Sequence, residues 1–280
     1  MPLRANPRWG LRFRADVRDE NWAIRNSFSG PAPVLSAFKM KRQSAAVRFA
    51  DVMSGRWSWA AEAEISHRSY GNVLQGILTP ALLDDGTELK QSISARANLL
   101  YLPERRFAID ADGTAAVSRL WGSTGRNFSQ IAGGIRLHWF PQHTGQLYEI
   151  QESVRAGTTF GDPTFDELGI LGVLGDTDLL MRAHIATRDG KKGSAPLGRN
   201  YFLSNWDATR DVSPFALVKI KVGPFIDVGK ISDPQPGLGS GQWLCDVGAQ
   251  ATLQVFGFGV SFSYGRDLRS GRNAVVARSR

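Results

Sequence analysis

The sequence predicts an all-β fold, namely an antiparallel transmembrane β-barrel. Three observations lead to this expectation. Thirteen stretches alternate apolar and polar residues with period two, and the connections between them are short and long in turn. No run approaches the ~20 consecutive apolar residues that a membrane-spanning helix needs. A barrel needs no such run, because only alternate residues of each strand face lipid.

The alternation is clearest in the segments 245–255 and 107–117, where the odd positions form an apolar face. Side chains on a strand point to opposite faces in turn, so each segment has one apolar and one polar side. In the first segment the even positions are polar or glycine. We expect its odd positions to face outward, toward lipid: Cys245, Val247, Ala249, Ala251, Leu253 and Val255.

The predicted strands cover residues 8–18, 22–29, 43–53, 57–68, 91–102, 106–121, 128–140, 147–160, 199–212, 215–231, 243–255, 258–266 and 272–280. The short connections fall at 19–21, 54–55, 103–105, 141–146, 213–214 and 256–257. The long ones fall at 30–42, 69–90, 122–127, 161–198, 232–242 and 267–271. Short turns at one end and longer loops at the other are typical of bacterial outer-membrane barrels. We therefore expect the chain in the bacterial outer membrane.

The polar faces of the strands carry charge. Glu62 and Glu64 share one face of strand 57–68, and Lys219, Lys221 and Asp227 share one face of strand 215–231. In a barrel these side chains would line a hydrated lumen. In a soluble protein they would face solvent, and the apolar faces would need a partner sheet. The alternation alone leaves both alternatives open.

Composition narrows the class of partner. The 280 residues carry a formal net charge of +8, but the arginines are spread over many strands rather than clustered, so we expect no nucleic-acid partner. The single cysteine excludes an internal disulfide. The first residues contain no apolar stretch of a secretion signal. Because a barrel must be exported, we expect that signal, and a missing N-terminal part, upstream of this chain.

No catalytic motif stands out. The sequence has no nucleophile elbow and no phosphate-binding loop, and its four histidines, including His184, show no metal-ligand spacing. Asp110 and Asp112 share a strand face, which a lumen or a solvent-facing surface explains. We expect no enzymatic activity, no cofactor and no metal.

Five segments in the second half of the chain carry a resemblance: 161–172 (GDPTFDELGILG), 180–184 (LMRAH), 193–203 (GSAPLGRNYFL), 223–229 (GPFIDVG) and 263–268 (SYGRDL). In their order and spacing they resemble the C-terminal barrel of the bacterial surface antigen D15 family, the Omp85-type outer-membrane assembly and translocation proteins. The resemblance covers a little under half of the chain.

The resemblance implies that the external loop 161–198 folds back into the lumen. Its tip, Arg182, Ala183 and His184, matches the Arg-Gly-aromatic tip of the family, with two departures that put the tight tip geometry in question. Carried over by position, Arg182 would meet Asp227 and its neighbours.

Those neighbours belong to the Phe-x-Asp-x-Gly motif that Phe225, Asp227 and Gly229 form. The period-two pattern independently places Asp227 on the inward, polar face of its strand. Asp207 also falls on a polar face and is a second candidate partner of the tip arginine. An Arg–carboxylate pair in a confined lumen would be charge-assisted and geometrically specific.

The family has sixteen strands, of which five follow the long loop, as they do in this chain. Eight predicted strands precede it, and an odd total of thirteen does not suit a bacterial barrel of this class. We therefore expect an N-terminally truncated sixteen-strand barrel, with a gap or strained closure between strands 8–18 and 272–280.

By resemblance, the function is insertion or translocation of proteins at the outer membrane. The partners would be outer-membrane lipid, lipopolysaccharide, and unfolded or exported proteins. An alternative is a barrel that anchors or exports a fused N-terminal, hydrolase-like domain. A third possibility is a simple diffusion pore, against which a loop of nearly forty residues in the lumen argues.

Overall fold

The computed structural model describes residues 9–26, 28, 32–54, 56–74, 76–103, 106–122, 125–142, 147–173, 179–213, 218–255 and 258–279. Its main element is a 14-stranded sheet, and a 2-stranded sheet accompanies it. The elements are β1 Trp9–Arg25, β2 Val34–Ser54, β3 Trp57–Leu74, η1 Pro80–Leu83, β4 Gly86–Leu102, β5 Phe107–Gly122, β6 Arg126–Trp139, β7 Tyr148–Gly161, η3 Phe165–Glu167, β8 Gly169–Ile170, β9 Thr187–Arg188, β10 Lys191–Lys192, β11 Leu197–Gly198, β12 Asn200–Asp211, β13 Val218–Ser232, β14 Leu244–Val255, β15 Phe258–Asp267 and β16 Asn273–Ser279.

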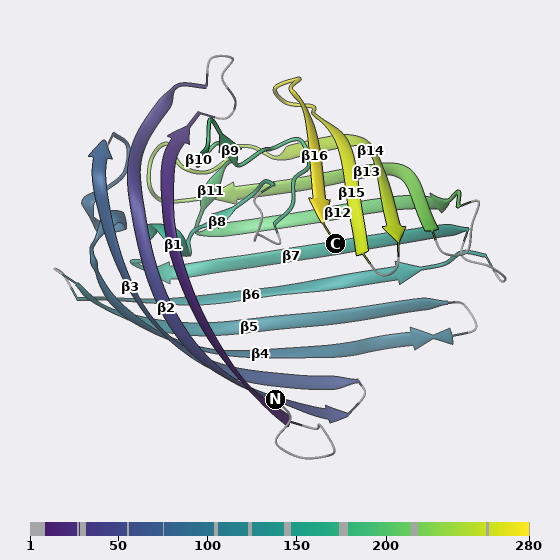
Figure 1. The fold of residues 1–280 in the computed structure, drawn as a ribbon, viewed down its shortest axis with the longest axis horizontal. Coiled ribbons are helices and arrows are strands. Elements are labelled where there is room, and N and C mark those ends of the chain that lie inside the picture. The colour runs from purple at the N-terminus through teal and green to yellow at the C-terminus, as the bar shows by residue number, and fades with distance from the viewer. Residues whose placement is uncertain are drawn as a thin grey trace.

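The long strands form one antiparallel meander. β1 to β7 pair in sequence order, β7 pairs with β12, and β12 to β16 continue in order. The sheet curls, so that β1 and β2 on one side and β14 to β16 on the other rise in front of β4 to β7 (Figure 1). Residues 162–199, which we call the long loop, lie between β7 and β12 and contain η3 and the short strands β8 to β11.

The sheet does not close among the described residues. β16 is one end of the sheet, only the short loop strands β10 and β9 follow β1 at the other, and among the described residues no pairing joins β1 to β16. β1 instead pairs in parallel with β10 of the long loop, through Trp22 and Lys192. The expected gap between the first and last strands is therefore present.

Two predicted strands are a single strand. The polar residues 19–21 predict a turn, whereas Asp19, Glu20 and Asn21 lie within β1 and pair with residues 39–41 of β2. The predicted long connection 30–42 is likewise wrong, because β2 begins at Val34. A polar stretch within a long strand resembles a turn in sequence, but cross-strand contacts such as the Asp19–Lys39 ion pair of 2.9 Å support the extended form. Seven long strands, not eight, therefore precede the long loop, and the twelve long strands are an even number.

β3 and β4 are also longer than predicted at the ends that face each other. β3 continues to Leu74 and β4 begins at Gly86, so the predicted connection 69–90 is shorter. The change in phase near Phe256 separates β14 from β15, and the turn itself lies outside the described residues.

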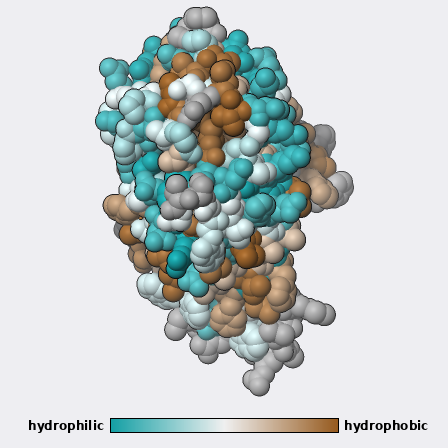
Figure 2. Space-filling model, turned by 90° about the vertical axis from the view of Figure 1, so that its left-hand side faces the viewer, coloured by the Kyte–Doolittle hydropathy of each residue, from teal (hydrophilic) through white to brown (hydrophobic). Residues whose placement is uncertain are grey.

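The outer face of the sheet is apolar and its inner face is polar. In β15, Phe258, Phe262 and Tyr264 are 83%, 51% and 52% exposed, whereas the intervening Ser261 and Ser263 are buried. In β14 the odd positions from Cys245 to Val255 are half-buried or exposed, as predicted for the outer face. In a water-soluble protein the exposed side chains are mostly polar and the buried ones apolar. The opposite distribution in this sheet suits a sheet surrounded by lipid. Figure 2 shows one side, hydrophilic over much of its upper half and with more hydrophobic side chains below.

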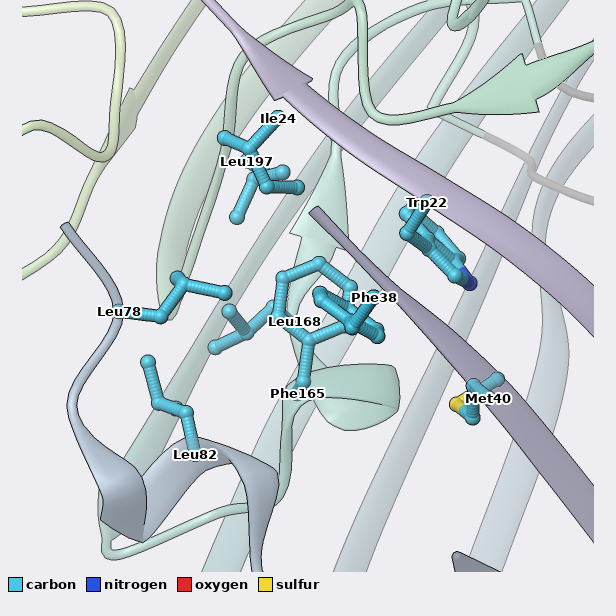
Figure 3. Packing of buried hydrophobic residues seen from close by; sticks show 9 residues of the cluster. All are labelled: Trp22, Ile24, Phe38, Met40, Leu78, Leu82, Phe165, Leu168 and Leu197. Carbon is cyan, nitrogen blue, oxygen red and sulfur yellow. The ribbon is translucent and has the colours of Figure 1, made fainter. Parts of the chain in front are cut away.

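The largest apolar core lies on the inner face near β1 and β2. It joins Trp22, Phe38 and Met40 of these strands to the long loop (Figure 3). Phe165 of η3 packs edge-on against the rings of Phe38 and Trp22, with centroids 4.8 and 4.9 Å away. The remaining members are Ile24, Leu78, Leu82, Leu168 and Leu197. The start of the long loop is thus held inside the curve of the sheet.

A second apolar cluster lies beneath the loop tip. Its buried members are Leu171, Leu179, Met181, Leu203, Ile231 and Leu244. Among the described residues, no helix has the length and apolar character to cross a membrane.

Candidate functional site

The tip of the long loop, residues 179–186, lies against the inner faces of β12 to β15. The backbone turns tightly here, since the His184 N–H donates to the Met181 carbonyl over 3.1 Å. The tip continues into the loop body, where the Val173 N–H donates to the His184 carbonyl over 2.7 Å. Its side chains therefore come from a turn that is anchored on both sides.

Arg182 is 3% exposed and binds Asp227 of β13 in three ways. Its backbone N–H and its Nε each donate to Asp227 Oδ2 over 2.9 Å, and its Nη2 donates to Oδ1. Such a two-pronged contact has the fixed geometry that a planar guanidinium favours. The extra bond from the backbone fixes the path of the chain as well as the side chain.

Two more strands contribute to the Arg182 site. The Arg182 Nη1 donates to Asp207 of β12 and to Gln250 Oε1 of β14. Gln250 in turn donates to Asp207 over 2.9 Å. Asn205 Nδ2 donates to Asp227 and to the Leu180 carbonyl of the tip, both over 2.7 Å. The tip arginine thus joins three adjacent strands.

Phe225 forms the floor of this site. The Arg182 Cζ lies 3.6 Å from the centre of the Phe225 ring, a cation–π contact. The ring crosses Gly248, its direct partner on β14, where a Cβ would lie 2.7 Å from a ring atom. Because Phe225 and Asp227 are two residues apart on one strand, they share the inner face.

Ala183, which stands where the family tip has glycine, is accommodated by the structure. Ala183 is buried and is absent from the described residues with positive φ, so alanine is accommodated without backbone strain. Its N–H donates to Asp246 Oδ2 over 2.7 Å. It lies over Gly265, where a Cβ would be 3.2 Å from the Ala183 nitrogen. At Gly229 a Cβ would meet Met181 Sδ and Leu171 Cδ1, each at 3.1 Å, so these glycines let the loop approach the sheet closely.

His184 points to two carboxylates that the sequence analysis did not connect with it. Its Nδ1 lies 3.1 Å from Asp246 Oδ2, and its Nε2 lies 3.7 Å from Asp267 Oδ2. Asp246 pairs directly with Asp227 and with Asp267 on the neighbouring strands. Three aspartates therefore form a buried row across β13, β14 and β15, and the tip residues 182–184 run along it.

The sequence missed Asn205, Gln250, Asp246 and Asp267. The signal that could have found the two aspartates is the period-two pattern, which places Asp246 and Asp267 on the polar faces of their strands. Their alignment in one row depends on strand register, which the sequence did not supply.

The start of the long loop is attached to the opposite wall by a second ionic cluster. Arg68 of β3 is fully buried and donates to Glu88 of β4 and to Thr164 Oγ1, the latter over 2.6 Å. Its Nη2 lies 3.2 Å from Asp166 Oδ2 of η3. Beside it, Lys90 of β4 donates to Glu167 Oε2. This cluster was not predicted from the sequence, because its members are up to 99 residues apart in the chain.

A charged cavity lies beside the start of the long loop. It has a volume of about 950 Å³ and is bounded by the inner faces of β1 to β7 and by the long loop. Its charged lining includes Arg14, Arg48, Arg96, Arg136, Glu62 and Asp112. The long loop therefore fills only part of the space inside the curved sheet.

No family model matches the chain, and no curated protein matches its sequence. Solved structures do match its fold. BamA from Haemophilus ducreyi lacking POTRA domains 1–3 matches with a TM-score of 0.67 and 12% identity, over 100% of this chain and 60% of that one. CdiB from Escherichia coli matches with a TM-score of 0.64 and 12% identity, over 98% of this chain and 51% of that one.

CdiB from Acinetobacter baumannii matches with a TM-score of 0.61 and 12% identity, over 98% of this chain and 48% of that one. The chain thus spans between about half and three fifths of the length of these proteins. The strand order, the inverted distribution of apolar residues and these likenesses agree with the resemblance in the motifs, and the chain shares its fold with these solved structures.

Proposed function

We propose that the chain is an outer-membrane barrel that inserts or translocates proteins, with the long loop as its functional element. The observation that carries this proposal is the buried contact of Arg182 with Asp227, Asp207 and Phe225, which holds the loop inside an Omp85-type fold. Arg182, Ala183, His184, Asp207, Phe225, Asp227 and Gly229 are the proposed site residues.

The outer face would contact membrane lipid, including lipopolysaccharide. Its exposed aromatic and aliphatic side chains favour a hydrocarbon environment, and unpaired backbone groups are costly there. The free edges of β1 and β16 therefore need partners in a bilayer. Below the Trp22–Lys192 bridge, the β1 edge offers backbone groups to which an incoming strand of an unfolded substrate could add.

The interior supports handling of a polypeptide rather than free diffusion. The long loop crosses the curved sheet and is attached to both of its walls. The cavity that remains is lined by both signs of charge, which suits transient contact with an extended chain more than selection of one small ion.

The test is insertion of a substrate into lipid vesicles. A urea-unfolded β-barrel protein is diluted into vesicles that contain the folded chain, and its folding is followed by protease protection. We expect faster folding than in empty vesicles, and slower folding with Arg182→Ala or Asp227→Asn. Arg119→Ala is the matched control, because Arg119 stacks on Trp121 far from the loop tip, 5.6 Å from the ring centre.

Equal folding rates in empty and protein-containing vesicles would contradict the proposal. A steady ion conductance in wild-type vesicles without any effect on the substrate would instead favour a diffusion pore.

A further inference from the structure

We propose that His184, Asp246 and Asp267 form a binding site for a divalent transition-metal ion of the zinc class. The three side chains come from the loop tip, β14 and β15, and are 6%, 0% and 2% exposed. Each offers one ligand atom, and these atoms lie within 4.8 Å of one another. This inference rests on the local geometry and does not depend on the proposed function.

The first argument is that two atoms facing this site lack partners. Among the described residues, His184 Nε2 and Asp246 Oδ1 are buried and have no hydrogen-bond partner. The His184 Nε2 lies 3.7 Å from Asp267 Oδ2, beyond hydrogen-bond reach. Buried polar atoms normally find a partner, so a bound cation accounts for both atoms at once.

The second argument is the excess of negative charge. Asp227, Asp246 and Asp267 pair directly across three strands, and like charges opposite one another destabilise a sheet. Arg182 compensates Asp227. Asp246 and Asp267 each form an ion pair with His184, and Asp267 also accepts hydrogen bonds from Ser270 Oγ and from the Arg269 and Ser270 N–H groups. One imidazole cannot neutralise two buried carboxylates.

The third argument is the kind of ligand. One imidazole nitrogen with two carboxylates is a set that zinc and similar ions accept, whereas calcium and magnesium prefer oxygen ligands alone. An ion at the centre of a triangle of this size would lie at most about 2.8 Å from each atom. A small rotation of the side chains reaches the bond lengths of about 2.0–2.2 Å that zinc adopts.

Such an ion would connect the loop tip to β14 and β15, next to the free edge strand β16. It would act in the same place as the aromatic residue of the family tip, which His184 replaces. The site would thus lock the tip to the C-terminal strands in addition to the Arg182 contacts.

The experiment measures metal binding by the folded, tag-free chain in detergent micelles, because a histidine tag would itself bind zinc. The protein is stripped with EDTA, and ZnCl₂ is then titrated calorimetrically in excess MgCl₂. We expect one equivalent of Zn²⁺ per chain. With CoCl₂, a visible absorption band of bound Co²⁺ should appear and then vanish on addition of Zn²⁺.

The variants are His184→Gln and Asp267→Asn, and each should weaken Zn²⁺ binding by more than about tenfold. His138→Gln is the matched control, because His138 also lies beside a carboxylate, Glu149, at 2.5 Å, but outside the proposed site. Heat-modifiable gel mobility checks the folding of each variant. The proposal is overturned if wild type binds no stoichiometric Zn²⁺, or if His184→Gln binds it as wild type does.

These readouts use no substrate protein. A chain that binds zinc but fails the insertion test would refute the proposed function alone, and a chain that inserts substrates without binding zinc would refute the metal site alone.

Discussion

The two ends of the long loop are held by opposite arrangements of charge. At the tip the loop supplies the cation, Arg182, and the sheet supplies the carboxylates Asp207 and Asp227. At the start, the loop supplies the carboxylates Asp166 and Glu167, and the sheet supplies the cations. The charges at the two ends of the loop therefore complement the charges of the two walls. A loop docked in the reverse direction would bring like charges together.

The two attachments also differ in how fully the polar atoms of their arginines are hydrogen-bonded. Arg182 has bidentate, backbone and cation–π contacts with its partners. Arg68 is fully buried, yet its Nε and Glu88 Oε1 have no hydrogen-bond partner among the described residues. The start of the loop instead gains stability from the apolar core around Phe165. The tip thus relies on polar contacts and the start on burial, and this difference can be tested.

The largest expected effect is that of Arg68→Ala. It leaves Glu88 and Asp166 buried without their main cation, and breaking a buried ion pair costs about 3–5 kcal/mol. Because Arg68 joins β3, β4 and the loop, we expect the urea midpoint of the whole barrel to fall in detergent. An unchanged midpoint would show that the apolar core alone holds this wall.

Arg182→Ala should loosen the loop more than it destabilises the barrel. The Arg182 and Ala183 N–H groups donate to Asp227 and Asp246, so freeing the tip exposes both to solvent. We expect faster hydrogen exchange over residues 179–186, with little change in the strands. Arg182→Lys should be intermediate, because a lysine cannot form the bidentate contact. Equal exchange in all three proteins would contradict the assigned role of the tip contact.

A smaller effect is expected for the Lys90–Glu167 pair. Lys90 is partly accessible, and its contact lies at the rim of the charged cavity. A double-mutant cycle with Lys90→Met and Glu167→Gln should give a coupling of about 1 kcal/mol in urea unfolding. A coupling as large as the loss in Arg68→Ala would mean that the two ion pairs act as one unit.

The last expected effect appears only in acid. Burial acts to raise the pKa of Glu167, but Lys90 and Arg68 outweigh it and hold the pKa at about 2. The unfolded value is about 4.3, so this stabilisation is present above that pH and is lost as the pH falls toward 2. We expect hydrogen exchange over residues 162–168 to stay constant from pH 7 to 5, after correction for intrinsic rates, and to rise below about 4. Glu167→Gln should remove this pH dependence.

Several features of the fold followed from local pattern. The inner and outer faces of β13 to β15 were predictable, because side chains alternate along any extended strand. The inward placement of Asp227 was predictable for the same reason, and the family motif pointed to Arg182 as its partner. The turn predicted at 19–21 was wrong, because polar residues within a long strand look like a turn when their partners on β2 are unknown.

The sequence by itself determined the all-β class and which side of most strands is polar, since both depend on neighbours along the chain. It did not determine the row of Asp227, Asp246 and Asp267, the neighbours of His184, or the contact of Arg68 with η3. These depend on strand register and on the path of the long loop, which bring together residues far apart in the sequence. A shift of one residue in a single strand would have placed a different set of side chains around the same loop.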